Sequence, residues 1–191
     1  MRVVVKVGGS LLGDGTRLRG VLAGLADGDE GPCIVVPGGG PDADAVRAAQ
    51  RDEGFSDAEA HRRALDAMSS TASRFRAIEP RLAPTRSPWD GVATETALVW
   101  DPAALRGGHP DIPETWDVTS DSLALWLAAR MRAPACLVVK SVDAAPGLDA
   151  EALSSSGLVD AAFPAFARCF PGSIAIRGPG RTVPIQRRRA A

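Results

Sequence analysis

Cysteine and histidine are scarce in this sequence, and the scarcity excludes several kinds of site. The three cysteines, Cys33, Cys136 and Cys169, are odd in number and scattered singly, which argues against a disulfide framework. Cys33 and Cys136 lie in apolar runs, where we expect buried free thiols. No cluster of histidine, cysteine, aspartate and glutamate has the spacing of zinc ligands, so we expect no metal held by protein ligands alone.

Long apolar runs and an excess of charge of one sign are also missing. No stretch approaches the roughly 18 uninterrupted apolar residues of a membrane-spanning helix, and the first residues resemble a strand rather than a leader. The net charge of −1 gives no sign of a nucleic-acid-binding surface. With 191 residues, 45% of them hydrophobic, the sequence predicts a single cytoplasmic domain over 1–191, with no nucleic-acid or membrane partner.

Three common catalytic motifs are absent. The sequence contains no G-x-x-x-x-G-K-[ST] phosphate loop, and no G-x-G-x-x-G fingerprint follows the first apolar run. It also lacks the G-x-S-x-G turn that presents the nucleophile of many hydrolases. The glycine-rich segments that are present therefore have to be interpreted from their own chemistry.

The most informative segment is Val3–Leu12, an apolar β-branched run that carries Lys6 and leads into Gly8, Gly9 and Ser10. A lysine at the end of a buried strand is costly unless its ammonium reaches a partner, and a phosphate is one such partner. The glycines let the backbone approach phosphate oxygens, and Ser10 is placed to cap the next helix, whose positive dipole end would face the same anion. The alternative is a lysine that extends to water before an ordinary turn.

A second segment repeats this arrangement. Gly38, Gly39 and Gly40 directly follow the apolar run Ile34–Val36, which indicates either a close approach of the backbone to a ligand or a flexible turn. In an open α/β sheet, ligands bind beyond the carboxyl ends of the strands, where both glycine loops would lie. This location favours a binding role for both loops.

Acidic and basic residues farther along the chain complete a site for phosphoryl transfer. Asp121 lies at an expected helix start, where it serves either as a capping acid or as an acceptor that holds lysine ammonium groups in place. Lys140 ends the apolar run Cys136–Val139, as Lys6 ends the first. Two such lysines provide the positive charge that a transferring phosphoryl group needs on its equatorial oxygens. Asp143 is a candidate for orienting the loop after Lys140.

Apolar runs alternate with helical patterns, which predicts an α/β fold with a mainly parallel sheet covered on both faces. The expected strands, short and almost wholly apolar, are Val3–Val7, Cys33–Val36, Ala97–Trp100, Cys136–Lys140 and Ser173–Ile176. Helices are expected after Pro41-Asp42, after a capping box at Ser56–Glu59, and from Asp117–Ser122 to Pro134.

The helix after Ser56 carries an apolar stripe at spacings of four and three residues, made of His61, Leu65, Met68, Ala72 and Phe75. Such a stripe is buried either on the sheet or against a second copy. We expect a homodimer or a higher even-numbered assembly with two-fold symmetry. On this face, His61 is expected to be a core or interface histidine rather than a catalytic base.

The segments without clear periodicity are expected to lie on the surface. Two stretches rich in proline, glycine and charge, Pro80–Asp90 and Pro102–Glu114, are expected to be loops or substrate lids. Trp89 and Trp116 are candidates for a wall of the substrate site. The terminal run Arg187–Arg189 is expected to be a solvated tail.

Taken in order, the motifs resemble those of the amino-acid kinase superfamily. They are Lys-Val-Gly-Gly-Ser after a first strand, Gly-Gly-Gly-Pro after a second, Thr-Ser-Asp-Ser at a helix start and Lys-Ser-Val-Asp after a late strand. The resemblance covers nearly the whole chain. It implies a three-layer α/β/α sandwich of the carbamate kinase type, and a kinase that uses ATP and Mg²⁺ to phosphorylate a carboxylate, carbamate or phosphate.

The resemblance also implies roles for the matching residues. The catalytic residues, which bind the transferring phosphoryl group or organise the lysines, would be Lys6, Asp121 and Lys140. The residues that hold the nucleotide phosphates would be Lys6, Gly8, Gly9, Ser10, Lys140 and Asp143. The residues that contact the acceptor substrate would be Gly38, Gly39, Gly40, Thr119 and Ser120.

Within the superfamily, three segments are most similar to the small kinases of methanofuran biosynthesis, namely Ala64–Met68, Trp116–Ala124 and Gly157–Pro164. Those enzymes phosphorylate [5-(aminomethyl)furan-3-yl]methyl phosphate to its diphosphate. The run Val142–Ala145 departs from the usual Val-Asp-Gly, and the segment after it is short, so we expect a trimmed adenine-binding region. The alternatives are a uridylate-type or other small phosphate or carboxylate kinase, and a non-catalytic binding or storage protein on the same fold.

Overall fold

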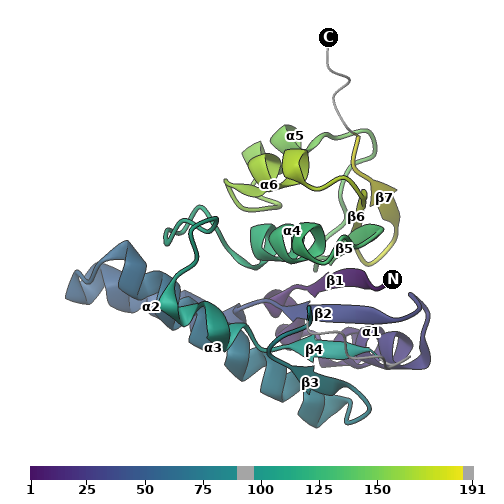
Figure 1. Ribbon diagram of the computed structural model, residues 1–191, viewed down its shortest axis with the longest axis horizontal. Helices are drawn as coiled ribbons and strands as arrows, with labels where there is room; N and C mark the ends of the chain where they lie inside the picture. The colour runs from purple at the N-terminus through teal and green to yellow at the C-terminus, as the bar shows by residue number, and fades with distance from the viewer. Residues whose placement is uncertain (90–96, 187–191) are drawn as a thin grey trace.

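The computed structural model describes residues 1–89 and 97–186, which form one sheet between two layers of helices (Figure 1). The seven described strands follow the order β3-β4-β2-β1-β5-β6-β7. Neighbouring strands are parallel except for β6 and β7, which pair antiparallel. The predicted fold class is confirmed.

The described strands are β1 (Val3–Val7), β2 (Cys33–Pro37), β3 (Ala83–Thr85), β4 (Leu98–Trp100), β5 (Ala135–Val139), β6 (Ser173–Arg177) and β7 (Thr182–Pro184). The α-helices are α1 (Gly15–Asp27), α2 (Gly40–Glu53), α3 (Asp57–Ile78), α4 (Ser120–Arg130), α5 (Ala150–Ser155) and α6 (Phe163–Cys169). Two 3₁₀ helices, η1 (Gly9–Gly13) and η2 (Pro102–Gly107), follow β1 and β4. No helix in this described part of the chain is long and apolar enough to span a membrane.

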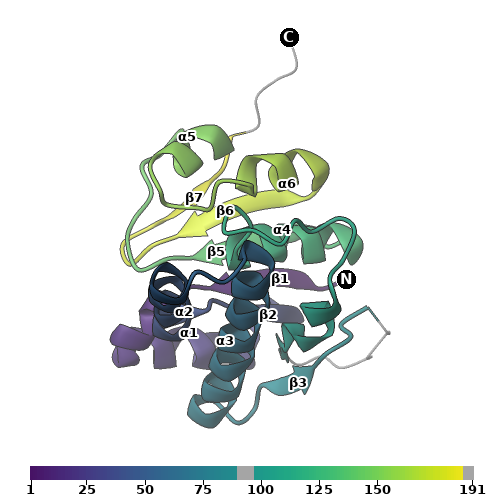
Figure 2. The ribbon, with the colours of Figure 1, turned by 90° about the vertical axis from the view of Figure 1, so that its left-hand side faces the viewer.

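Apolar side chains on both faces of each central strand explain the two helical layers. Along β1, Val4 packs in the cluster that contains α4, and Val5 packs in the cluster that contains α1, as the two-residue period of a strand requires. The helices α5 and α6 belong to the α4 layer, whereas the C-terminal half of α3 lies with α1 (Figures 1 and 2). Lys6 shares the face of Val4, so its side chain points toward α4.

The central strand β1 is the point at which the sheet changes its direction of growth. It pairs with β2 on one side and with β5 on the other. The chain builds β2 and its neighbours β4 and β3 on the first side, and then crosses to β5, β6 and β7 on the second. Ligands of open α/β sheets bind at such a switch point, beyond the carboxyl ends of the strands.

Two short edge strands, β3 and β7, were not expected from the sequence. The stretch Pro80–Asp90, expected to be a loop, contains β3, and the expected loop Pro102–Glu114 begins with η2. Strand β3 is only three residues long and includes a proline, which an edge strand tolerates because one side needs no ladder partner. Asp90 and the run Arg187–Arg189 lie outside the described residues.

The apolar stripe of α3 is buried within a single chain, since all five of its side chains are at most 5% exposed. A second copy is therefore not needed to cover it. Ser56 caps this helix, because its Oγ accepts a hydrogen bond from the N–H of Glu59 (3.3 Å). The carboxylate of Glu59 accepts a hydrogen bond from Nε of Arg63 (2.8 Å). The structure therefore shows only the serine half of the expected capping box.

Candidate functional site

The two glycine loops lie against each other beyond the carboxyl ends of β1 and β2. The N–H of Gly38 donates a hydrogen bond to the carbonyl oxygen of Val7 (2.9 Å). A Cβ atom on Gly9 would overlap the backbone of Gly40, and a Cβ atom on Gly38 would overlap the backbone of Gly9. Glycine is thus required at positions 9 and 38 because two backbones meet there, a reason that the sequence alone does not reveal.

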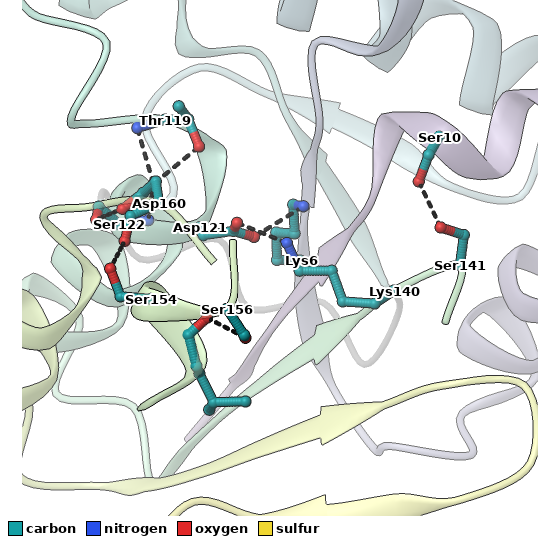
Figure 3. A network of polar contacts seen from close by, with 11 residues as sticks. Lys6, Ser10, Thr119, Asp121, Ser122, Lys140, Ser141, Ser154, Ser156 and Asp160 are labelled. Atoms are coloured by element: carbon teal, nitrogen blue, oxygen red, sulfur yellow. Dashed lines mark hydrogen bonds and ion pairs between the residues drawn. The ribbon is translucent and has the colours of Figure 1, made fainter. Parts of the chain in front are cut away.

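Beside these loops, one carboxylate joins two lysines (Figure 3). Nζ of Lys6, on β1, lies 2.8 Å from Oδ1 of Asp121, and Nζ of Lys140, directly after β5, lies 2.6 Å from Oδ2 of the same group. The three side chains are 5%, 13% and 6% exposed for Lys6, Lys140 and Asp121, respectively. Of the two roles considered for Asp121, the geometry corresponds to the one in which it holds the lysine ammonium groups.

The charges of this group are strongly coupled. Burial alone would raise the pKa of Asp121. The ammonium groups of Lys6 and Lys140 together have a larger, opposite effect, so this pKa lies below its ordinary value. Burial, followed by repulsion from Lys6, lowers the pKa of Lys140 to about 8, against the opposing effect of Asp121. Two ammonium charges and one carboxylate charge leave a net charge of +1, which favours the binding of an anion.

A cavity of about 370 Å³ adjoins the two lysines. Part of its wall consists of both lysines and both glycine loops. The rest of the wall comes mainly from α2, α3 and the segment before α4; it includes Ala43, Asp44, Arg47, His61, Ala64, Leu65, Met68, Trp116 and Val118. The cavity thus suits a small molecule that carries an anionic group.

Trp116 lines this cavity, as the sequence suggested for a wall of the substrate site. Its Nε1 donates a hydrogen bond to Oε1 of Gln50 (2.6 Å), and the guanidinium of Arg47 lies 4.3 Å from the ring centroid. His61 also lines the cavity as a buried side chain, and burial lowers its pKa. The second candidate, Trp89, packs edge-on against Trp126 instead (6.3 Å between centroids).

Ser10 lines the cavity, but it does not cap a helix. The five-residue turn η1 intervenes between β1 and α1, and Asp14 caps α1 by accepting a hydrogen bond from the N–H of Arg17 (3.1 Å). The hydroxyl of Ser10 instead donates to the hydroxyl of Ser141 (3.1 Å), which joins the first glycine loop to the loop after β5. The capping role expected for Ser10 is therefore wrong.

Asp143 lies apart from the lysine pair, and it is not among the described residues that line the cavity. Its Oδ1 accepts hydrogen bonds from the N–H groups of Gly180 (3.0 Å) and Arg181 (3.1 Å). These bonds fasten the loop after β5 to the turn between β6 and β7. The expected orienting role fits this geometry, whereas contact with a nucleotide stays a prediction.

Thr119 and Ser120 line the cavity at the start of α4, and Thr119 leads to a residue that the sequence analysis missed. The carboxylate of Asp160 accepts hydrogen bonds from the backbone N–H groups and from the hydroxyl groups of both Thr119 and Ser122. Asp160 lies about forty residues downstream, so no local pattern connects it with this helix. The only signal was the segment Gly157–Pro164, noted for its resemblance alone.

The donors of the site fit phosphate groups, and any Mg²⁺ would arrive bound to those phosphates. Within 1–89 and 97–186, no group of three or more His, Cys, Asp and Glu residues could hold a metal ion, and Asp121 is already paired with two ammonium groups. Mg²⁺ is commonly held by substrate phosphates with few protein ligands. Lys6, Lys140 and the backbone of Gly8 to Ser10 would then hold the phosphate oxygens.

One protein-family model matches part of the chain. Residues 1–79 match the model of the Amino acid kinase family. This part of the chain contains β1, both glycine loops and all of α3. No curated protein matches the sequence.

Solved structures share the fold over almost the whole chain. Uridylate kinase from Archaeoglobus fulgidus superposes with a TM-score of 0.63 at 18% identity, and the match covers 97% of this chain and 91% of that one. UMP kinase from Ureaplasma parvum gives 0.67 at 11% identity, covering 98% and 99%. Aspartate kinase from Synechocystis gives 0.65 at 17% identity, covering 100% of this chain and 41% of that one. The fold implied by the resemblance is thereby confirmed.

Proposed function

We propose that this chain, which has the fold of uridylate and aspartate kinases, is an ATP-dependent kinase of the amino-acid kinase family that phosphorylates a small phosphomonoester. The observation that carries the proposal is the pairing of Lys6 and Lys140 with one buried carboxylate, at a cavity walled by two glycine loops. Fixed cations in such a site stabilise the charge that develops on a transferring phosphoryl group.

In this proposal the protein positions charges and forms no covalent bond itself. Bound ATP supplies the phosphoryl group, and Mg²⁺ neutralises part of the charge on the phosphates. An oxygen of the acceptor phosphate forms a bond to the γ-phosphorus while the bond to the ADP oxygen breaks. Lys6 and Lys140 offset the charge on the equatorial oxygens, and Asp121 keeps both ammonium groups in place. The first glycine loop holds the donor phosphates, and the second, Gly38–Gly40, holds the acceptor.

For the acceptor we propose [5-(aminomethyl)furan-3-yl]methyl phosphate, which would be converted to its diphosphate. Support comes from the similarity of three segments to the small kinases that use this compound. The lining of the cavity agrees with it, because Leu65, Met68 and Val118 offer an apolar wall for a small flat ring. Asp44, which also lines the cavity, offers a carboxylate for the aminomethyl group.

The test is to measure ADP formation from ATP with a panel of acceptors, and to identify the product by ³¹P NMR. The panel contains the aminomethylfuran phosphate, UMP, aspartate and a control without acceptor. We expect turnover with the aminomethylfuran phosphate, and a diphosphate as its product. Preference for UMP would instead establish a uridylate-type kinase, the alternative favoured by the fold comparisons. Tight ATP binding without transfer to any acceptor would indicate a binding or storage protein.

A further inference from the structure

Asp160 has no part in the transfer described above, yet it contacts the first turn of α4 at four points. Its Oδ2 accepts hydrogen bonds from the N–H of Thr119 (2.8 Å), from the hydroxyl of Thr119 (2.8 Å) and from the N–H of Ser122 (3.0 Å). Its Oδ1 accepts a hydrogen bond from the hydroxyl of Ser122. Asp121 lies inside this turn, between the two residues that Asp160 binds.

We propose that Asp160 is a positioning residue, a role that rests on the proposed kinase function. By fixing the first turn of α4, it directs the carboxylate of Asp121 toward the two lysines. Figure 3 shows Asp160 and its hydroxyl donors on one side of Asp121 and the lysines on the other. Thr119, the N-cap residue of α4, makes no capping bond with its own side chain, so the distant carboxylate provides the cap.

Asp160 is itself held in place. The hydroxyl of Ser154, at the end of α5, donates a hydrogen bond to the carbonyl oxygen of Asp160 (3.1 Å). The N–H of Ala162 donates to the carbonyl oxygen of Asp117, just before α4 (2.9 Å). The segment between α5 and α6 is therefore bound to α5 on one side of the carboxylate and to the approach of α4 on the other, and it can act as a fixed support.

A partly buried carboxylate is a costly way to cap a helix. Burial, followed by the charge of Asp121, raises the pKa of Asp160, while hydrogen bonds from Ser122 and Thr119 oppose this. The side chain of an ordinary serine or threonine at the N-cap satisfies the same donors without a second negative charge beside Asp121. Asp160 additionally fixes the orientation of the turn, because it binds two residues of that turn through both of its oxygens.

The experiment is an NMR titration of lysine side chains labelled with ¹³C at Cε. The chain has only two lysines, both in the site, so their signals report on it without any need for turnover. The negative charge of Asp121 raises the pKa of Lys140, so a misdirected Asp121 should let Lys140 titrate at lower pH. We expect this shift in Asp160→Asn.

Ser122→Ala keeps every charge and removes only one of the four bonds. A smaller shift of Lys140 in the same direction is expected there, and it can arise only from position, not from a lost charge. It also decides the question if Asp160→Asn fails to fold. Asp149→Asn is the matched control, because Asp149 caps α5 by accepting from the N–H of Ala152 (2.9 Å). It should leave both lysine titrations unchanged.

Turnover provides the second readout. In Asp160→Asn we expect kcat to fall by about tenfold to a hundredfold, a larger change than that of the KM for the acceptor, because misplacement of the charges affects the transition state more than it affects binding. Unchanged lysine titrations in both variants, with only a lower melting temperature, would overturn the positioning role and leave the kinase proposal intact. Absence of turnover in the wild type would reject the kinase proposal, and the lysine titrations would still decide the role of Asp160.

Discussion

At the scale of single residues, the division of labour between lysine and arginine is the clearest feature. Of 22 basic residues, only Lys6 and Lys140 are lysines, and both contact Asp121. Exposed ion pairs such as Arg168–Glu151 (2.9 Å) use arginine instead. A lysine ammonium is a compact point charge whose pKa responds to burial, whereas a guanidinium is a planar fork that stays charged. Lysine therefore occurs only where two small charges have to converge on one group.

Lys6→Ala should nearly abolish transfer while the protein stays folded. The variant removes a fixed positive charge from the point where negative charge develops, and such losses typically lower the rate by about a hundredfold to a thousandfold. Steady-state turnover and a thermal melt of the same preparation check this. The matched control is Arg168→Ala, which removes an exposed cation distant from the lysines and should keep full activity. A folded Lys6→Ala protein with wild-type turnover would show that the site has been placed wrongly.

The pH dependence of activity should reflect Lys140. Its pKa of about 8 means that the ammonium is lost as the pH rises through this value. Because the charged form binds phosphate oxygens, we expect kcat/KM to decline above pH 8, and kcat/KM reports the groups of the free enzyme. A profile that stays flat up to pH 10 would contradict the assignment of Lys140 to phosphate binding.

The titration of Lys140 should affect stability in the opposite direction, so that the protein becomes more stable as the pH rises. Its folded pKa of about 8 lies below the ordinary value of 10.5, so between these values the unfolded chain binds more protons than the folded one. The contribution of Lys140 to the free energy of unfolding therefore rises with pH across this window. Below pH 8 the cost of burying the charged lysine lowers the free energy of unfolding by its full amount. The free energies of unfolding of the wild type and of Lys140→Met, measured with denaturant, should differ by an amount that changes between pH 8 and 10.5.

At the scale of secondary-structure elements, the two glycine loops act as one unit because their backbones touch. Gly38→Ala would place a Cβ atom against the backbone of Gly9 and force the loops apart. We expect a loss of about 1–3 kcal/mol in the free energy of unfolding, together with a loss of transfer. In Gly20→Ala, the control, the new Cβ would meet nothing within 4 Å in the middle of α1. That change should stabilise the protein by about 0.5–1 kcal/mol. If the two variants melt at the same temperature, the loops do not depend on their contact.

The elements that could be predicted are those with a local signal. Each of the five expected strands appears within one residue of its expected ends, because an apolar run buried on both faces is continuous in sequence. Strand β7 was missed because three exposed-edge residues carry no such pattern. The capping of α4 was missed for another reason: Thr119 meets Asp160 only through the fold. Lys6 and Asp121 could be proposed from the sequence because a glycine loop and a helix start mark them locally, and Lys140 because it ends an apolar run.

At the scale of the whole molecule, the switch point at β1 explains why residues 6, 121 and 140 meet. Lys6 comes from the central strand, Lys140 from the end of its neighbour β5, and Asp121 from the helix that leads into β5. The order of the motifs in the sequence does not by itself show that these three residues meet, because the order of the strands in the sheet is also needed. A parallel sheet of the expected class still allows other orders, so the site could be anticipated as a set of residues but not as a geometry.

The oligomeric state is a prediction for the whole molecule. The stripe on α3 is already covered inside the chain, so it no longer supports the expected homodimer or higher even-numbered assembly, which stays a prediction. Light scattering at micromolar concentration should give an even multiple of 19.8 kDa. A single mass of 19.8 kDa would mean that the protein acts as a monomer.

Both lysines of this chain lie beside the cavity with side chains at most 13% exposed, so the chain carries its side-chain amines in one place only. An acylating reagent, which on most proteins reacts all over the surface, can reach a lysine here only by the route that a substrate takes. The mass of the two lysine peptides after brief acylation therefore measures whether the cavity is occupied. Any compound that slows this modification is a ligand, so candidate substrates can be ranked before their reaction is known.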